Sequence, residues 1–161
     1  MSALTHVDPK NRPTMVAVGD KDVTRRTARA RAVVTFPPEA APKTSEALRT
    51  KKGPVFDTAI IAGVMAAKHT HDLIPFCHSI ALEDCQIAID WGGDGEVVIE
   101  CTARATHKTG VEMEALMGAT VAALTVYDMC KALSHGICIR EIKLLSKTGG
   151  KRDFVASESH G

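Results

Sequence analysis

Apolar residues along the chain recur with the two periods of regular secondary structure, and these periods predict its elements. Residues 27–36 are rich in Val, Thr and Ala and predict a strand. Pro37-Pro38 ends it, because proline lacks the N–H that a sheet ladder needs. Apolar residues at helical spacing predict a helix that starts at Asp57, as its N-cap, and runs to Lys68. A short helix is also expected over residues 44–48.

The clearest local pattern is a β-hairpin. Apolar and polar residues alternate over 85–91 and again over 97–103. The segment between them, Gly92-Gly93-Asp94-Gly95, is a strong turn signal because its residues tolerate the backbone angles of tight turns. These two segments therefore predict a pair of antiparallel strands.

A capping-box pattern marks the start of a longer helix. Thr109 is expected as the N-cap and Glu112 as the residue whose side chain returns to the helix start. The helix is predicted over residues 111–134, with His135-Gly136 as its stop, and a last strand over 137–145.

The order of these elements predicts the fold class. Strand, helix, two hairpin strands, long helix and strand indicate an α+β fold: a ferredoxin-like antiparallel sheet with helices packed on one face. We expect a flexible N-terminal arm over 1–14, a single domain carrying any catalytic site over 15–152, and a C-terminal tail over 153–161.

Composition narrows the function classes. Of 161 residues, 45% are hydrophobic and 24% charged, which is typical of a folded domain and excludes a disordered chain. No apolar run approaches the roughly 20 residues of a membrane span. Lys and Arg number 20 against 19 Asp and Glu, so no global field attracts nucleic acid or a membrane surface. Five cysteines without a C-x-x-C pair and no apolar leader favour a cytoplasmic protein.

The predicted long helix carries a second apolar stripe that ends in an acid and a base. Its apolar members are Met113, Met117, Val121 and Leu124, and it ends in Asp128 and Lys131. Residues three apart on a helix have Cβ atoms ~5–6 Å apart, so the two charges can pair. Partial desolvation there would move both pKa values toward neutrality, as proton transfer requires. The alternative is a solvated ion pair worth only ~0.3–0.5 kcal/mol, and the spacing allows both interpretations.

Two acidic residues near the start of the same helix raise a question of distance. Glu112 is explained by the capping box, but Glu114 lies within ~40° of Asp128 around the helix axis and ~21 Å from it along the axis. Either the helix breaks near Gly118, or each end works with groups of a neighbouring subunit. We prefer the second, because an antiparallel symmetric pair would bring one helix's start near the other's end.

Cations and soft ligands form smaller clusters. Lys52-Gly53 and the basic segment 147–152 combine cations with glycine, which suits phosphate, although solvated loop charge explains them equally well. Arg25-Arg26, with Arg29 and Arg31, is a third basic cluster. A zinc site is an alternative function for a cluster of His and Cys residues, although their spacing fits no common structural-zinc pattern. Its candidate ligands are His69, His71, Cys77 and His78.

Several of these segments together resemble the cyclic pyranopterin monophosphate synthase family, or MoaC family, over nearly the whole chain. The matching strings are Leu4-Thr5-His6, Lys52-Gly53, Ala66-Ala67-Lys68-His69-Thr70, Asp72-Leu73-Ile74-Pro75-Phe76-Cys77-His78, Gly110-Val111-Glu112-Met113-Glu114-Ala115-Leu116, Tyr127-Asp128-Met129-Cys130-Lys131 and Leu145-Ser146-Lys147-Thr148-Gly149-Gly150-Lys151.

The resemblance implies a reaction and an assembly. It implies conversion of 3′,8-cyclo-7,8-dihydroguanosine 5′-triphosphate into cyclic pyranopterin monophosphate, with release of pyrophosphate. It also implies a hexamer built from dimers, with active sites at the dimer interface. No resident metal or cofactor is implied, and Mg²⁺ is an optional aid.

The resemblance further implies which residues act. Asp128 and Lys131 would be the acid/base pair, with Lys52 as a second proton carrier. The other residues implied at the site bind substrate: Phe76, Cys77, His78, Glu112, Met113 and Glu114, with Arg26 and Lys147 as cations on the phosphate side.

The chain departs from the family pattern at two places, neither of which touches the acid/base pair. Ala17 stands where the family usually has Asp, and Arg152-Asp153 where it usually has Ser-Gly. The second change makes the backbone after Lys151 less permissive. The alternatives are a non-catalytic nucleotide-binding module and a small zinc enzyme.

Overall fold

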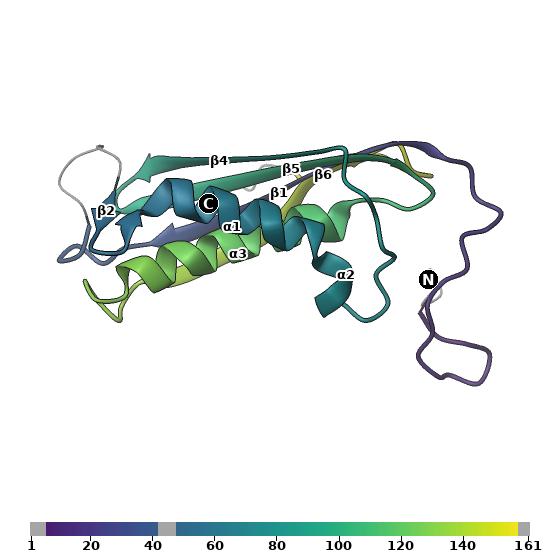
Figure 1. Ribbon diagram of the computed structural model, residues 1–161, viewed down its shortest axis with the longest axis horizontal. Helices are drawn as coiled ribbons and strands as arrows, with labels where there is room; N and C mark the ends of the chain where they lie inside the picture. The colour runs from purple at the N-terminus through teal and green to yellow at the C-terminus, as the bar shows by residue number, and fades with distance from the viewer. Residues whose placement is uncertain (1–5, 42–47, 158–161) are drawn as a thin grey trace.

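A single antiparallel sheet organises the chain. The computed structural model describes residues 6–41 and 48–157 (Figure 1). Neighbouring strands in the sheet follow the order β4-β5-β1-β6-β7 and are antiparallel. Their bounds are Thr24–Thr35 (β1), Asp84–Gly93 (β4), Glu96–His107 (β5), Cys138–Thr148 (β6) and Phe154–Val155 (β7). With the helices in sequence, the four long strands have ferredoxin-like topology, so the predicted fold class is confirmed.

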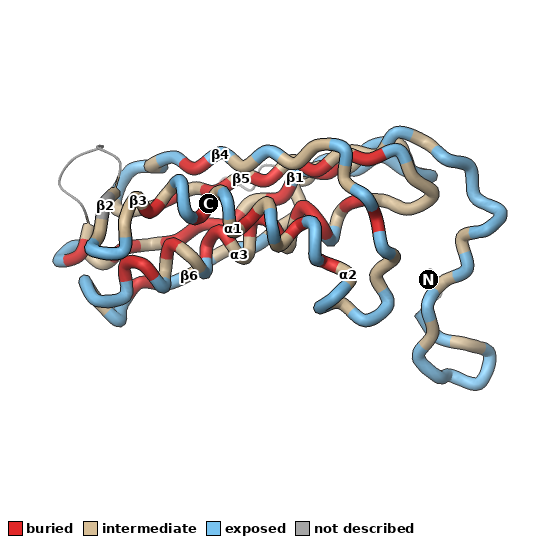
Figure 2. Tube along the Cα trace, viewed as in Figure 1, coloured by how far each residue is buried: buried red, intermediate tan, exposed pale blue. Residues whose placement is uncertain are grey.

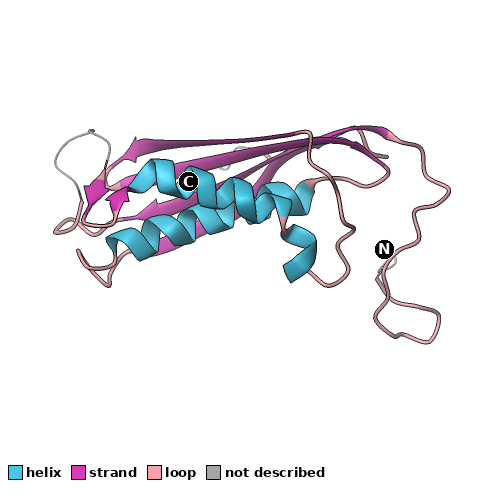
Figure 3. Cartoon of the chain, viewed as in Figure 1, coloured by secondary structure: helices cyan, strands magenta, loops and turns pink. Residues whose placement is uncertain are grey.

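The helices cover one face of this sheet (Figure 3). Helix α1 spans Val55–Lys68, α2 is a short turn over Thr70–Leu73, and α3 spans Glu112–Cys130. Helix α3 packs on β1, β5 and β6, while α1 packs on α3 and β4. A small ribbon of β2 (Arg49–Thr50) and β3 (Gly53–Pro54) precedes α1. The helix expected over 44–48 lies outside the described residues except for Leu48, which belongs to no helix.

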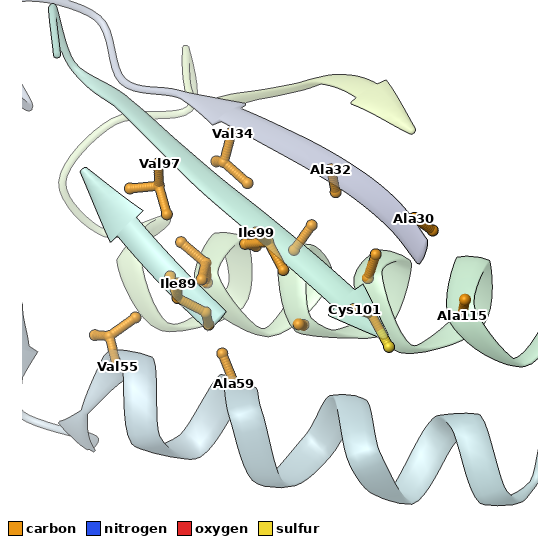
Figure 4. Close-up of a cluster of buried hydrophobic side chains, with 14 of the residues drawn as sticks. Ala30, Ala32, Val34, Val55, Ala59, Ile89, Val97, Ile99, Cys101 and Ala115 are labelled. Atoms are coloured by element: carbon orange, nitrogen blue, oxygen red, sulfur yellow. The ribbon is translucent and has the colours of Figure 1, made fainter. Parts of the chain in front are cut away.

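The core between sheet and helices is made largely of small side chains. Alternate residues of β1 and β5 are buried (Figure 2), and those labelled in Figure 4 point toward the helices. They include Ala28, Ala30, Ala32 and Val34 on β1, and Val97, Ile99, Cys101 and Ala103 on β5. Ala115, Ala119, Ala122 and Ala123 of α3 are buried in the same core, so small side chains meet on both sides of the layer between helix and sheet. This explains how a chain with 4% aromatic residues still has a packed core.

Helix α1 ends at Lys68, as predicted, but the other ends of α1 and α3 differ from the prediction. Helix α1 begins at Val55, so Asp57 lies inside its first turn and Pro54 occupies the N-cap. The N-cap of α3 is Val111, because the Thr109 hydroxyl hydrogen-bonds to Nδ1 of His107 instead. The predicted capping box is therefore wrong. Helix α3 also ends at Cys130, four residues before the predicted end, and the chain continues as turns.

Both predicted terminal segments contain described structure. Val7 forms a bridge with Pro13, so part of the expected N-terminal arm is a small loop closed on itself. In the expected tail, β7 pairs with β6 through Val155 opposite Ser146 and Phe154 opposite Lys147. Within the described residues, no helix is long and apolar enough to cross a membrane.

Candidate functional site

The first group of predicted site residues meets at the C-terminal end of α3. Oδ1 of Asp128 lies 2.7 Å from Nζ of Lys131, one turn further along, and Oδ2 lies 2.7 Å from Nζ of Lys52. Lys52 also donates to the main-chain carbonyl of Asp128 at 3.0 Å. The turn between β2 and β3 carries Lys52, so two elements distant in sequence deliver two ammonium groups to one carboxylate. The three residues predicted as catalytic are thus brought together.

The electrostatics of this group differ from the sequence prediction. Hydrogen bonds from Lys131 and then Lys52 lower the pKa of Asp128 to about 2, and Asp128 in turn raises the pKa of Lys131. A shift of both pKa values toward neutrality was expected from desolvation, and this is wrong for the described chain. The Asp128 side chain is 55% exposed, so direct pairing outweighs burial. At neutral pH the group consists of one carboxylate and two ammonium ions.

The second group surrounds a cavity of about 350 Å³ at the other end of α3. Six of the predicted substrate-binding residues line it: Phe76, Cys77, His78, Glu112, Met113 and Glu114. The segment after α2 supplies the first three, and the first turn of α3 supplies the others. In Figure 1, α2 and the N-terminal segment lie at this end of the molecule, whereas β2 lies at the opposite end. We call this the first cavity.

Glu114 is the most unusual residue of the first cavity. It is 2% exposed, and its Oε1 accepts a hydrogen bond from the Cys77 thiol at 3.6 Å. Its Oε2 has no partner among the described residues. Burial raises the pKa of Glu114. Burial and the neighbouring carboxylate also raise the pKa of Cys77 to about 11, so the thiol stays protonated at neutral pH and is a poor nucleophile.

The N-terminal segment also forms part of the first cavity, which the sequence did not predict. His6, Val16, Val18 and Lys21 line it. Nε2 of His78 lies 2.8 Å from the main-chain carbonyl of Val16, which can only accept, so Nε2 carries the proton. These residues are isolated in a polar, Pro-containing stretch, and no periodicity could have indicated them. Ala17, where the family pattern has Asp, is exposed and is not among the lining residues.

The two predicted phosphate-side cations lie beside this cavity. Nζ of Lys147 is 2.8 Å from Oε1 of Glu112, which explains why Glu112 does not cap its helix. Arg26 donates from Nε to the carbonyl of His107 at 3.2 Å and from Nη2 to the carbonyl of Lys108 at 3.1 Å. Both cations are therefore fixed near the start of α3.

A second cavity of about 390 Å³ is bordered by one of these cations, Arg26. It is lined by Asp20, Lys21, Asp22, Thr24, Arg26, Gly149, Gly150 and Lys151. Gly149 has a φ of +88°, and a Cβ there would overlap the carbonyl of Arg25 on β1. The basic glycine-rich segment predicted to suit phosphate thus forms one wall of a cavity whose other wall is the N-terminal segment.

The structure brings each group together but leaves the two groups apart. Helix α3 is unbroken at Gly118, so Glu114 and Asp128 remain ~21 Å apart along its axis. The stripe between them is partly uncovered: Met113 is 37% exposed and Leu124 52% exposed. A ligand no longer than the first cavity therefore cannot contact both groups of one chain.

The candidate zinc ligands have other partners. His69 and His71 both contact the carboxylate of Asp72, at 2.8 and 3.3 Å, while Cys77 faces Glu114 and His78 faces Val16. Within residues 6–41 and 48–157, no group of three His, Cys, Asp or Glu side chains could hold a metal ion.

Comparisons with known proteins agree with one another. The chain matches the protein-family model described as MoaC family over residues 15–150. A cyclic pyranopterin monophosphate synthase of Xanthomonas axonopodis pv. citri (strain 306) is 55% identical over 156 residues, which cover 96% of this chain and 94% of that protein. The protein of the same name from Xanthomonas campestris pv. campestris (strain B100) is 57% identical over 155 residues, with the same coverage. Molybdenum cofactor biosynthesis protein 1 of Drosophila melanogaster is 49% identical over 161 residues, which cover 98% of this chain and 28% of that protein.

Proposed function

Since the chain belongs to the MoaC family and is an enzyme of molybdenum cofactor biosynthesis, with the role of a cyclic pyranopterin monophosphate synthase, we propose that two subunits share its active site. In this proposal the substrate is 3′,8-cyclo-7,8-dihydroguanosine 5′-triphosphate, and the products are cyclic pyranopterin monophosphate and pyrophosphate. The first cavity of one subunit holds the ring system. Asp128, Lys131 and Lys52 of the other subunit carry out proton transfer.

The observation that supports sharing is the separation of the two groups. They stand on one straight helix ~21 Å apart, which is longer than the ring system of a nucleotide-sized substrate. An antiparallel two-fold pairing of α3 helices would place each acid/base group beside the partner's first cavity. It would also bury the exposed apolar stripe between the groups. A hexamer would then be built from three such dimers.

The acid/base group offers a carboxylate and two amino groups to ring rearrangement, and in the free enzyme their pairing keeps the pKa values of Asp128 and Lys131 away from neutrality. Opening the purine ring and closing the pyrazine ring needs protons delivered to nitrogen atoms and removed from them. In our proposal Lys131 donates a proton and then serves as the base, while Asp128 holds the Lys131 side chain in place. Lys52, bound to the same carboxylate at 2.7 Å, is the second proton carrier.

The first cavity supplies binding and orientation. Phe76 and Met113 offer apolar surface to a flat ring, and the proton on Nε2 of His78 fixes which nitrogen can accept. Cys77 and Glu114 line the same wall. In our proposal the buried Glu114 carboxyl meets the polar edge of the pterin, since its Oε2 lacks a partner within the described residues. Glu112 keeps Lys147 beside the cavity for the phosphates.

The remaining parts of the proposal concern cofactor and location. The proton transfers use side chains only, so no resident cofactor is needed. Mg²⁺ would enter as the counter-ion of the triphosphate, and a comparison of turnover with and without EDTA tests this. The five cysteines are free thiols, which agrees with action in the reducing cytoplasm.

Anaerobic turnover of the cyclic dihydro-GTP intermediate tests the proposal. We expect the wild type to release pyrophosphate and form the pterin product, and Asp128→Ala to lose ~10²–10⁴-fold in rate. Asp90→Ala is the matched control, because Asp90 is exposed on β4 and lines neither cavity. Wild-type binding without turnover would instead support a nucleotide-binding module.

A further inference from the structure

Two cysteine sulfurs lie against each other on the side of the sheet that faces the helices. Cys85 is on β4 and Cys101 is on β5, and their Sγ atoms are 3.8 Å apart. In the part of the chain that the structure describes, no other pair of cysteine sulfurs is within hydrogen-bond distance. Both residues are free thiols, so the structure shows the reduced form of a pair that is close enough to react.

The register of the hairpin makes this pair diagonal rather than directly opposite. Cys85 is paired with Ala103, and Cys101 is paired with Ile87. Diagonal neighbours on one face of a sheet have Cα atoms ~7–8 Å apart, whereas a relaxed disulfide has its Cα atoms ~5.5–6 Å apart. A bond between the two sulfurs would therefore pull β4 and β5 together and be strained. Strained disulfides are readily reduced again, which suits a reversible bond.

The two thiols differ in exposure and acidity, and this difference sets the order in which they react. Cys85 is half-buried near the start of an edge strand, whereas Cys101 is completely buried on the neighbouring strand. The hydrogen bond with Cys101 lowers the pKa of Cys85, and the same contact, together with burial, raises the pKa of Cys101. Because the thiolate is the form that reacts with oxidants, Cys85 is oxidised first and Cys101 is placed to attack it in turn.

The sulfur of Cys101 also lies against helix α3. Figure 4 shows this side chain in the layer between β5 and the helices. A Cβ at Gly118 would be 2.6 Å from the sulfur, so the backbone of α3 passes close to it. Gly118 stands between Glu114 and Asp128, on the helix that carries both groups of the site. A disulfide would draw the sulfur toward Cys85 by ~1–2 Å, and a closely packed core does not fill such a gap unless the helix moves.

We infer that Cys85 and Cys101 form a redox switch: hydrogen peroxide joins their sulfurs in a reversible disulfide, which loosens α3 and thereby lowers turnover. In the first step Sγ of Cys85 bonds to one peroxide oxygen, the O–O bond breaks, and the other oxygen leaves as water with the thiol proton. In the second step Sγ of Cys101 bonds to Sγ of Cys85 and the S–O bond breaks. The hydroxyl group then leaves as water with the Cys101 thiol proton. The two sulfurs together lose two electrons, which the peroxide gains.

Mass spectrometry of the peroxide-treated protein gives the direct test. We expect the oxidised wild type, once denatured, to bind two thiol-blocking groups fewer than the reduced protein, and dithiothreitol to restore both. Cys85→Ser should lose none of its remaining thiols, and its half-buried position at the sheet edge should let the variant fold. Cys138→Ser is the matched control, because Cys138 is exposed on β6 and its loss should leave the bond intact. A wild type that keeps all its thiols would overturn the inference, as would Cys85→Ser losing two.

Hydrogen exchange and turnover test the effect of the bond on α3. We expect oxidation to speed the exchange of α3 amides and to lower wild-type turnover about tenfold, because a displacement of ~1 Å in a site can cost that much or more. Dithiothreitol should reverse both effects, Cys138→Ser should respond like the wild type, and Cys85→Ser should respond to neither treatment. A disulfide form with unchanged exchange and full turnover would overturn the switch. A wild type without turnover would refute the proposed function, while mass and hydrogen exchange would still decide this inference.

Discussion

At the scale of single residues, the buried carboxyl of Glu114 lowers the stability of the native state when it is ionised. Burial raises its pKa above the ordinary value of 4.5. In the native state this carboxyl therefore resists losing its proton, and the native state loses stability as pH rises through and above that value. A carboxyl whose pKa is shifted by burial in this way is typical of a binding or catalytic site.

Replacing this carboxyl by an amide should stabilise the protein at neutral pH. Glu114→Gln keeps the shape of the protonated side chain and cannot ionise, so we expect its Tm to exceed the wild-type value by a few degrees at pH 7. Below pH 4.5 the difference should vanish, because Glu114 is then protonated in both the native and the unfolded state. Thermal unfolding followed by circular dichroism at pH 4 and pH 7 measures both. Glu112→Gln, which removes the ion pair with Lys147, should show no such gain. A gain for Glu114→Gln that is equal at both pH values would contradict the explanation.

Asp128 should titrate far below neutrality. Its pKa is held at about 2, mainly by the hydrogen bond from Lys131. A carboxyl ¹³C titration should find a midpoint near pH 2 in the wild type, a higher one in Lys52→Met and the highest in Lys131→Met. The stability that this pairing contributes is present above the ordinary value of 3.8 and is lost only as pH falls toward 2, so neutral assays are unaffected. A wild-type midpoint near 4 would show that the lysines do not hold the carboxylate.

The sequence predicted that Asp128 and Lys131 pair, but it did not predict the direction in which pairing shifts their pKa values. The i, i+3 spacing of Asp128 and Lys131 is sufficient to place two side chains of one helix together. Lys52 comes from another element, and only the family resemblance indicated it. The direction of the pKa shift depends on exposure and on that third residue, so spacing alone could not give it.

At the scale of elements, local patterns predicted the four long strands and the end of α1 at Lys68, but missed the start of α1 and both ends of α3. The hairpin strands were predicted over 85–91 and 97–103 and are observed over Asp84–Gly93 and Glu96–His107. Their alternation reflects one buried face, which is a local property. The capping box failed because Glu112 binds Lys147 instead, a contact across 35 residues. A four-residue motif gives no information about a competing partner that is this distant in sequence.

Close packing of α1 on α3 depends on glycine. A Cβ at Gly63 would lie 2.7 Å from the carbonyl of Gly118 and would overlap the end of Ile87. We expect Gly63→Ala to destabilise the fold, because overpacking costs about 1–3 kcal/mol and outweighs the gain in helix propensity of about 1 kcal/mol. Urea unfolding measures the difference. Gly19→Ala is the control, since a Cβ there meets nothing within 4 Å. A more stable Gly63→Ala would mean that the two helices can separate without loss.

At the scale of the whole molecule, the separation of the site groups was predictable and their surroundings were not. Helix rise alone placed Glu114 and Asp128 ~21 Å apart, and the unbroken α3 confirms this. The N-terminal segment lines the cavities through His6, in the arm expected over 1–14, and through positions between 16 and 22, in the domain expected over 15–152, and no pattern indicated these contacts. Its path is set by single contacts such as His78 to Val16, which carry no periodic signal.

If two subunits share each active site, mixed dimers of inactive variants should regain activity. Asp128→Ala lacks the acid/base group and His78→Ala lacks part of the first cavity, so we expect each alone to be nearly inactive. In a dimer that contains one of each, one site combines both defects and the other is intact. After random subunit exchange, half the dimers are mixed and half their sites are intact, so activity should return to about a quarter of the wild-type value.

The matched control uses two variants from the same end of α3. Asp128→Ala mixed with Lys131→Ala should stay inactive, because every site in the mixed dimer then receives one defective acid/base group. Pyrophosphate release, measured anaerobically before and after exchange, compares the two mixtures. If the mixture of Asp128→Ala and His78→Ala stays as inactive as this control, subunits do not exchange groups. The acid/base residues would then act on a substrate bound within their own chain, and the ~21 Å along α3 would have to be crossed by the substrate itself.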